Sequence, residues 1–502
     1  MRKTAILSIL IFYSIGIFSQ SCFNKDRYQK SIFDSITITE NITYAIAPQL
    51  VPTEVLGIKT YDEEEFEDVS LQMDIYQPYG DTLEQRPMIL FMHSGGFLPD
   101  YGDRHNDDML AFCDSFARKG YVTATMSYRL GYDVLDSSAA IRAVYRAVQD
   151  GRAAIRFLKE NAANYNIDTN NIFMLGSSAG AFIALHNTYL NEESERPDDT
   201  YGNDDRPNLG GLDTVNVDIH HGSLAKAIVS LWGALRDTAL ILKKDIRPTL
   251  LVHGIDDESV YFEYDHPFGL STLPKVYGSH PVYKKLKQLD YDAPHYFVPE
   301  QEHEFYGIDG GKWEDDAPNA YWDTILNDVT NFIYEQLPKP EALFTYNVDC
   351  GVYFVNNSKK QVANCWSFGD STYSKDKNPY HIYTDDSTFN VNLAVVNYIG
   401  IVDEQEQIVG FEKCMASVAN LNVEESIQLY PNPASQFLYV KKSGVDNNKK
   451  QTIAILNLIG QKVVARQLSN SENKIDISFL NSGVYFLVIE GEKRQVLKFV
   501  KE

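Results

Sequence analysis

The chain has 502 residues, of which 44% are hydrophobic and 12% aromatic, and its formal net charge at pH 7 is −24. This hydrophobic content is typical of a globular chain rather than a disordered one, and the length predicts two to four domains. The negative charge argues against nucleic acids and anionic membranes as partners.

The first twenty residues have the pattern of an export signal. Arg2 and Lys3 precede a short apolar run over residues 4–18, and small and polar residues follow. The run is too short to cross a bilayer, so we expect residues 1–20 to be a signal peptide and the mature protein to have no transmembrane helix. Lipid attachment at Cys22 is a disfavoured alternative, because the residues before it match a lipidation signal poorly.

The five cysteines lack the spacing of a metal-binding cluster, so we expect neither a metal nor a cofactor. In an exported chain, Cys350 and Cys365 are candidates to form a disulfide because they are close in sequence and lie in one predicted domain. Cys113 lies in a helical pattern and is expected to be a buried thiol.

Strand and helix patterns alternate from about residue 70 to residue 335. The helical stretches have apolar residues at spacings near 3.6, with charges between them. Near-continuous apolar runs are typical of parallel strands buried on both faces, so we expect an α/β sheet with helices on both sides, within a domain over residues 21–337. The runs are Met88–Met92, Val122–Tyr128, Ile172–Leu175, Ala227–Leu231, Thr249–Val252 and Tyr296–Val298.

A glycine pair follows the first of these runs, in the segment His93-Ser94-Gly95-Gly96-Phe97. Because glycine has no side chain, the backbone N–H groups of Gly95 and Gly96 can approach a substrate oxygen closely. An ordinary Gly-Gly turn is the alternative, but the position directly after a strand favours an oxyanion-binding loop.

The run at 172–175 leads into Gly176-Ser177-Ser178-Ala179-Gly180, and an apolar helical stretch follows. A G-x-S-x-G sequence between strand and helix predicts a nucleophile elbow, a turn so tight that glycines are needed on both sides of the serine. It would expose the Ser178 hydroxyl at the positive end of a helix, with the Ala179 N–H as a further oxyanion donor. The sequence G-x-S-x-G alone is weak evidence, and the interpretation depends on this context.

A nucleophilic serine needs a base and an acid that orients the base. Asp256, Asp257 and Glu258 all follow the run at 249–252; we favour Asp257, with Asp256 as the alternative. His303 follows the last predicted strand and precedes the closing helix, so it is the preferred base. These residues occur in the order serine, acid, histidine that the α/β-hydrolase fold uses.

Two further features lie between the elbow and the acids. The acidic segment 191–205, with the stretch to residue 221, is expected to form a cap over the serine, and a solvated loop is favoured over a calcium site within 198–205. His220 and His221 are interpreted as exposed loop residues, because no spaced third metal ligand accompanies them.

Together these motifs, with Ser127–Leu130, resemble the α/β-hydrolase superfamily, in particular its secreted carboxylesterase and feruloyl-esterase-like branch, over about residues 40–335. The resemblance implies an acyl-enzyme mechanism with Ser178 as nucleophile, His303 as base and Asp257 as its orienting acid. Two positions differ from the family pattern: Ser94 stands where glycine is usual, and Ser177 where many relatives have Glu or Asp.

The character of the chain changes after the linker Leu337–Pro340, where helical periodicity ends. Residues 341–415 look like a PKD-type β-sandwich, on the runs Cys365–Asp370 and Asn378–Tyr383. Residues 425–502 resemble a type IX secretion C-terminal sorting domain of the Bacteroidetes, on the landmarks Leu429–Ala434, Ile459–Val463, Gly483–Tyr485 and Lys498–Lys501. That resemblance implies the type IX machinery as a partner, passage through the periplasm, and release or surface attachment.

The sequence therefore predicts a secreted serine carboxylic-ester hydrolase, with polysaccharide-linked acetyl or feruloyl esters as the leading substrate hypothesis. Two alternatives stay open: a serine peptidase of the same fold, and a surface-binding protein with an inactive hydrolase domain.

Overall fold

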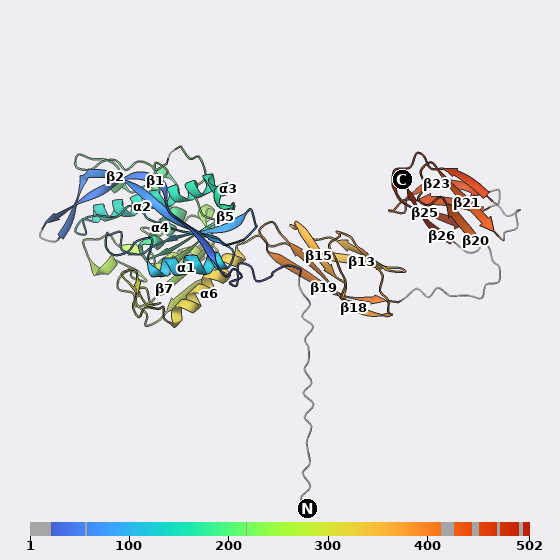
Figure 1. The fold of residues 1–502 in the computed structure, drawn as a ribbon. Helices are drawn as coiled ribbons and strands as arrows, with labels where there is room; N and C mark the ends of the chain where they lie inside the picture. The colour runs from blue at the N-terminus through green and yellow to red at the C-terminus, as the bar shows by residue number, and fades with distance from the viewer. Residues whose placement is uncertain are drawn as a thin grey trace, which may run out of the picture. The chain divides into compact units, whose positions relative to one another are not determined.

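The computed structural model describes residues 22–55, 58–216, 218–412, 426–443, 451–468, 472–490 and 495–502. The predicted signal peptide, residues 1–20, lies outside them. The described residues up to 412 belong to one compact unit and those from 426 to a second, and each is described by itself (Figure 1).

An eight-stranded sheet forms the centre of the first unit, in the order β1-β2-β4-β3-β5-β6-β7-β10. β1, β2 and β4 pair antiparallel, and every pair from β4 to β10 is parallel. The strands are β1 (Ile36–Val55), β2 (Ile58–Pro78), β3 (Arg86–Met92), β4 (Val122–Met126), β5 (Ile167–Ser177), β6 (Ala227–Leu231), β7 (Thr249–Gly254) and β10 (His295–Val298). The two-stranded pairs β8 (Tyr264–Asp265) with β9 (Val276–Tyr277), and β11 (Ile308–Asp309) with β12 (Lys312–Trp313), lie in the loops.

Helices cover both faces of this sheet, because alternate residues of each buried strand point to opposite sides. In β3, Met88, Leu90 and Met92 join one core, whereas Ile89 and Phe91 join the other. The first core includes α2 (Ser137–Glu160), α4 (Ala179–Tyr189) and α5 (Ser279–Gln288); the second includes α1 (Asp107–Arg118) and α6 (Ala320–Glu335). α3 (Ala162–Tyr165) is a short helix before β5. The predicted α/β-hydrolase fold is confirmed.

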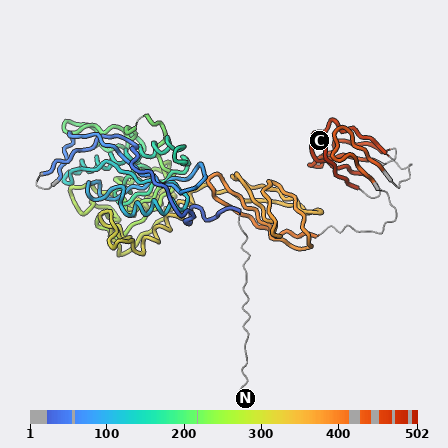
Figure 2. Tube along the Cα trace, in the orientation of Figure 1, coloured from blue at the N-terminus to red at the C-terminus, as the bar shows by residue number. Residues whose placement is uncertain are grey.

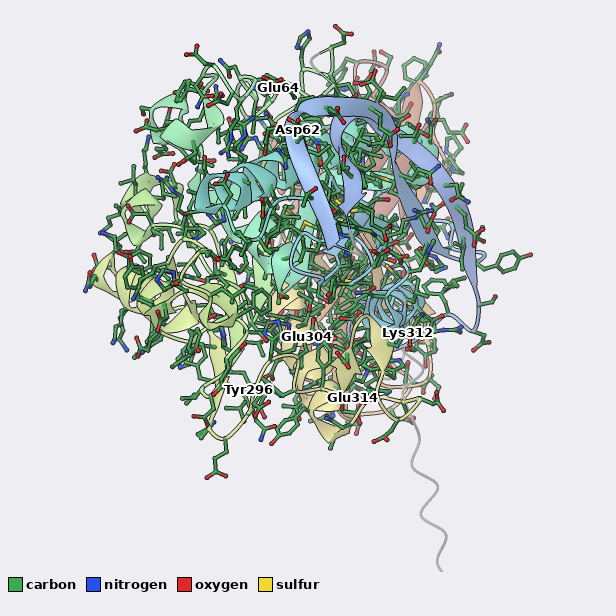
Figure 3. The ribbon with its side chains drawn as sticks, turned by 90° about the vertical axis from the view of Figure 1, so that its left-hand side faces the viewer. Asp62, Glu64, Tyr296, Glu304, Lys312 and Glu314 are labelled. Atoms are coloured by element: carbon green, nitrogen blue, oxygen red, sulfur yellow. A yellow bond between two sulfur atoms is a disulfide. The ribbon has the colours of Figure 1, made fainter. Side chains whose placement is uncertain are left out.

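The sequence patterns did not predict the long ribbon that β1 and β2 form at the edge of the sheet. Only Met73–Tyr76 of β2 pair with β4, so most of the ribbon is two-stranded. Asp62 and Glu64 mark its outer part in Figure 3.

Two small antiparallel sheets follow the hydrolase part within the first unit, and we call them the β13–β19 sandwich (Figure 2). Phe344, Phe354, Trp366 and Leu393 are buried between the sheets. An all-β segment after the linker is confirmed, whereas its PKD-type assignment and its boundaries stay predictions. The strands are β13 (Phe344–Val348), β14 (Val352–Asn356), β15 (Ala363–Ser367), β16 (Tyr373–Ser374), β17 (Tyr380–His381), β18 (Ser387–Val396) and β19 (Val402–Phe411).

The second unit is also all-β, as expected. Its two sheets have the orders β20-β21-β24 and β23-β22-β25-β26, and buried aliphatic side chains such as Leu438, Ile455 and Leu487 form its core. The strands are β20 (Ser426–Tyr430), β21 (Phe437–Ser443), β22 (Gln451–Leu456), β23 (Lys462–Leu468), β24 (Glu472–Asp476), β25 (Gly483–Glu490) and β26 (Gln495–Lys501).

A disulfide between Cys22 and Cys365 joins the start of the described chain to the sandwich. The suggested Cys350–Cys365 pair is therefore wrong: distance along the chain is a poor guide where a terminal segment folds back across a domain. The same bond occupies the Cys22 sulfur, which argues against lipid attachment there. Cys113 is a buried free thiol, as expected.

Other contacts fix the sandwich against the hydrolase part. The Tyr398 hydroxyl donates to Asp168 at 2.8 Å, and the Tyr28 hydroxyl donates to the carbonyl of Ile399 at 2.7 Å. Ile399 and Ile401 pack into the same core as α1 and α6. Among the residues that the structure describes, no helix combines the length and hydrophobicity that a membrane crossing requires.

We predict that Cys22→Ala lowers the free energy of unfolding by about 2–4 kcal/mol, because a cross-link that closes a long loop restricts the unfolded chain. Denaturant unfolding of the oxidised protein measures the change. The double variant Cys22→Ala/Cys365→Ala should lose little more than either single variant. Additive losses would show that the two cysteines stabilise the protein independently.

Candidate active site

Ser178 occupies the turn between β5 and α4. Its backbone has φ 51° and ψ −114°, a conformation that costs energy for a residue with a side chain. Its amide donates to the carbonyl of Leu231 on β6 at 3.0 Å. The surrounding sheet therefore holds the serine in a conformation that local propensity would not choose.

The two glycines of the motif are required by contact distances. A Cβ atom on Gly176 would lie 2.0 Å from the carbonyl oxygen of Gly180, and one on Gly180 would lie 2.1 Å from that of Met92. Both distances are far inside van der Waals contact, so no larger residue fits at either position. This explains the predicted G-x-S-x-G sequence in steric terms.

The structure brings His303 between Ser178 and Asp257. Nε2 of His303 lies 2.9 Å from the Ser178 Oγ, and its Nδ1 lies 2.6 Å from Oδ2 of Asp257. Asp256, the alternative acid, is exposed and instead accepts from the backbone N–H of Glu300 at 2.7 Å. The geometry favours Asp257 over Asp256, and the catalytic roles themselves stay predictions.

Asp257 is held rigidly. Its Oδ1 accepts from the amides of Ser259 and Val260, both at 2.8 Å, and His253 Nε2 lies 3.2 Å from its Oδ2. Burial would raise the pKa of Asp257, but the charge of His303 and the histidine hydrogen bonds outweigh it and hold the pKa well below the ordinary value. The acid is therefore ionised at neutral pH.

The same pair determines the protonation of His303. Burial would lower the pKa of its imidazole, but the adjacent Asp257 carboxylate more than compensates and raises it above the ordinary value. A carboxylate on Nδ1 leaves Nε2 free to accept the proton of Ser178.

The predicted oxyanion donors are only partly brought together. Gly96 and Ala179 line the same cavity as Ser178, whereas Gly95 is not among its lining residues. Gly95 and Gly96 have φ values of 119° and 58°, which favour glycine. Within the described chain, the Gly96 and Ala179 amides donate to no carbonyl, so they are available to a ligand.

His93 supports this loop. Its carbonyl accepts from the amide of Gly180 at 3.1 Å and from the Tyr128 hydroxyl at 2.9 Å, so it ties the glycine loop to the elbow. Burial lowers the pKa of its imidazole to about 4, so the ring is neutral.

Sequence reasoning missed a polar group behind the triad. The Ser177 hydroxyl donates to Oε1 of Glu304 at 3.3 Å and accepts from the Trp232 indole N–H at 2.9 Å. Burial raises the pKa of Glu304, although His303 opposes the rise. Many members of the resembled family have a carboxylate at the elbow position that Ser177 occupies here. In this chain the carboxylate beside that position comes instead from Glu304, next to His303. The adjacency of Glu304 to His303, with serine at 177, was the available signal.

A largely apolar cavity opens at Ser178, with about 810 Å³ of empty space, part of it open to solvent. One face of α2 and the segment 260–276 form much of its wall. Besides Gly96, Ser178 and Ala179, the lining residues are Phe97, Tyr132, Ala140, Ile141, Val144, Tyr145, Val148, Phe182, His186, Leu190, Pro197, Arg236, Val260, Pro267, Phe268, Leu273, Pro274 and Val276.

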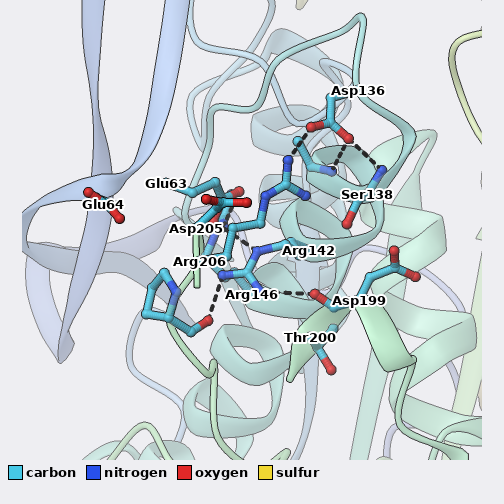
Figure 4. Close-up of polar contacts among 12 residues, drawn as sticks. Glu63, Glu64, Asp136, Ser138, Arg142, Arg146, Asp199, Thr200, Asp205 and Arg206 are labelled. Carbon is cyan, nitrogen blue, oxygen red and sulfur yellow. Dashed lines mark hydrogen bonds and ion pairs between the residues drawn. The ribbon is translucent and has the colours of Figure 1, made fainter. Parts of the chain in front are cut away.

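The expected cap over residues 191–221 is therefore not the main cover, since Pro197 is its single contribution to the lining. Arg142 of α2 explains why: its guanidinium donates to the carbonyls of Asp199 and Pro207 at 2.9 and 2.8 Å and to Glu63 of the ribbon at 2.9 Å (Figure 4). These bonds hold the segment against α2.

His220 and His221 are both exposed, as expected, and His221 pairs with Glu160. No cluster of metal-ligating side chains occurs among the residues that the structure describes.

Comparison with known families agrees with this architecture in two places. Residues 73–215 match the family model described as BD-FAE, and residues 428–502 match the one described as Secretion system C-terminal sorting domain. The chain thus contains an esterase-like α/β-hydrolase segment and ends in a secretion sorting domain, as its motifs predict.

Curated relatives match shorter stretches. Gut esterase 1 of Caenorhabditis briggsae is 32% identical over 113 residues, which are 22% of this chain and 19% of that protein. Phenmedipham hydrolase of Pseudarthrobacter oxydans is 31% identical over 140 residues, 27% of each chain. The chain therefore spans well under half the length of these relatives. Apo esterase 2 of Thermogutta terrifontis aligns over 59% of this chain and 98% of its own, with 18% identity and a TM-score of 0.37.

We predict that Asp257→Asn lowers the pKa of His303, because the neutral amide no longer stabilises the imidazolium. An NMR titration of the imidazole resonances measures this. Asp256→Asn is the matched control and should leave the His303 pKa in place. Equal shifts in both variants would contradict the pairing of His303 with Asp257.

Proposed function

We propose that the chain is a serine carboxylic-ester hydrolase. The observation that carries the proposal is the chain of contacts Asp257–His303–Ser178, at 2.6 and 2.9 Å, beside a cavity lined by Gly96 and Ala179. The esterase-like segment and the esterases among the relatives support the same class. An acid, a base and a serine hydroxyl in hydrogen-bond contact argue against an inactive hydrolase domain.

The reaction follows from the positions of these groups. Ser178 Oγ attacks the ester carbonyl carbon as its proton passes to Nε2 of His303, and the backbone amides stabilise the oxyanion that forms. When the tetrahedral intermediate collapses, the alcohol leaves with the proton from His303. Water then attacks the acyl-enzyme by the same route, which releases the acid and restores Ser178.

For the substrate, we retain polysaccharide-linked acetyl or feruloyl esters. An aromatic acyl group suits a cavity walled by Phe97, Tyr132, Phe182 and Phe268. The sorting domain indicates export, and an exported enzyme with an additional β13–β19 sandwich is compatible with an extracellular polymer as substrate. This support comes from domain association and not from the chemistry of the site.

We predict that Ser178→Ala lowers kcat for 4-nitrophenyl acetate by at least about 10³-fold, because the acyl-enzyme cannot form. The thermal unfolding temperature should change little. Paraoxon phosphorylates the Thermogutta terrifontis enzyme, so it is a suitable probe: wild-type protein should gain one diethylphosphoryl group at Ser178, and the variant none. Near-normal turnover by the variant would refute the mechanism.

We further propose that the second unit directs export and takes no part in catalysis. A chain ending at residue 412 retains the Cys22–Cys365 disulfide and all the proposed catalytic groups, so it should hydrolyse esters. In the native cell it should accumulate in the periplasm, and the exported wild-type protein should have lost C-terminal residues by mass spectrometry. Normal extracellular levels of the shortened chain would show that the unit serves another purpose.

A further inference from the structure

One residue with a charged side chain lines the cavity at Ser178. Of the lining residues, Arg236 alone carries a formal charge at neutral pH, and none is an aspartate or glutamate. His186 also lines the cavity, but burial lowers the pKa of its imidazole to about 4, and it is neutral. A single guanidinium therefore determines the charge of an otherwise apolar pocket.

The backbone of Arg236 is fixed from three sides. Its amide donates to Nε2 of His186 at 3.1 Å, and Nδ1 of His186 lies 2.8 Å from the carbonyl of Phe182, which fixes the neutral tautomer. The preceding Leu235 pairs with Tyr277, and the following Asp237 caps the short helix Thr238–Leu240. The side chain thus starts from a rigid position beside the cavity.

The guanidinium of Arg236 has no ion pair and no hydrogen bond to any other residue in the described chain. Most other arginines in the described hydrolase part are paired, among them Arg129 with Asp150 and Arg142 with Glu63, whereas Arg247 has no ion pair there. Carboxylates are abundant, since the chain has 69 acidic residues against 45 basic ones. An unpaired guanidinium on a residue that lines the pocket of so acidic a protein is available to a ligand.

We infer that Arg236 selects esters that carry a carboxylate, on either the acyl or the alcohol part. A guanidinium matches a carboxylate through two parallel N–H···O bonds, and apolar walls strengthen the attraction. The inference rests on the proposed ester hydrolysis at Ser178. It adds an anionic group as the substrate feature that the pocket recognises.

Two pairs of probes test this on the full mature chain. For the acyl side, mono-4-nitrophenyl adipate is compared with neutral 4-nitrophenyl heptanoate. For the alcohol side, carboxymethyl butyrate is compared with ethyl butyrate. The readout is the ratio of kcat/KM for the charged ester to that for the neutral ester within one preparation, so a loss of folded protein cancels.

In Arg236→Gln we expect this ratio to fall about tenfold to a hundredfold in one of the two pairs, the cost of a lost charge-assisted contact. Arg236→Lys should retain more of the ratio than Arg236→Gln. Arg247→Gln is the matched control, because Arg247 is half-buried and lines a different surface pocket. Its ratio should equal that of the wild-type protein.

A ratio in Arg236→Gln equal to the wild-type ratio in both pairs would overturn the inference, while hydrolysis of the neutral esters would leave the proposed function standing. If the wild-type protein hydrolyses neither member of either pair and paraoxon does not label Ser178, the proposed function itself fails and the inference fails with it.

Discussion

The exclusion of any side chain at Gly180 is the constraint on which the site depends. With its Cα so close to the Met92 carbonyl, the start of α4 packs directly against the end of β3. The same approach lets the Gly180 amide bond to His93, which joins the elbow to the glycine loop. The conformation of Ser178, the position of α4 and the position of the glycine loop thus all depend on the same packing contact.

Burial then gives each polar group its chemical state. Asp257 is ionised because the charge of His303 and the histidine hydrogen bonds outweigh the effect of burial, whereas His93 and His186 are neutral because burial outweighs their hydrogen bonds. In His303 the balance is the opposite, because the carboxylates of Asp257 and Glu304 raise its pKa despite burial. Two kinds of histidine environment thus occur within one active-site region, one that keeps the ring neutral and one that favours its protonation.

Much of this was predictable because the signals are local. Continuous apolar runs predict the parallel strands. The elbow has no room for side chains at Gly176 and Gly180, so these glycines are recognisable in the sequence. The choice between Asp256 and Asp257 was open, because adjacent residues in a turn point in different directions and sequence does not fix the turn. Three features depend on contacts between distant parts of the chain, which no local pattern encodes. They are the disulfide partner of Cys365, the contact of Glu304 with Ser177, and the packing of 191–221 against α2.

The contact between Tyr398 and Asp168 has a consequence for access. Asp168 lies near the start of β5 and Ser178 follows its end; on the neighbouring β3 this span corresponds to Arg86–Met92, so the two are separated by roughly 20 Å along the sheet. The sandwich is therefore anchored at the opposite edge of the sheet from the serine. A bulky polymer can therefore present one ester to the mouth of the cavity without contacting the sandwich. The β13–β19 sandwich does not restrict access to Ser178.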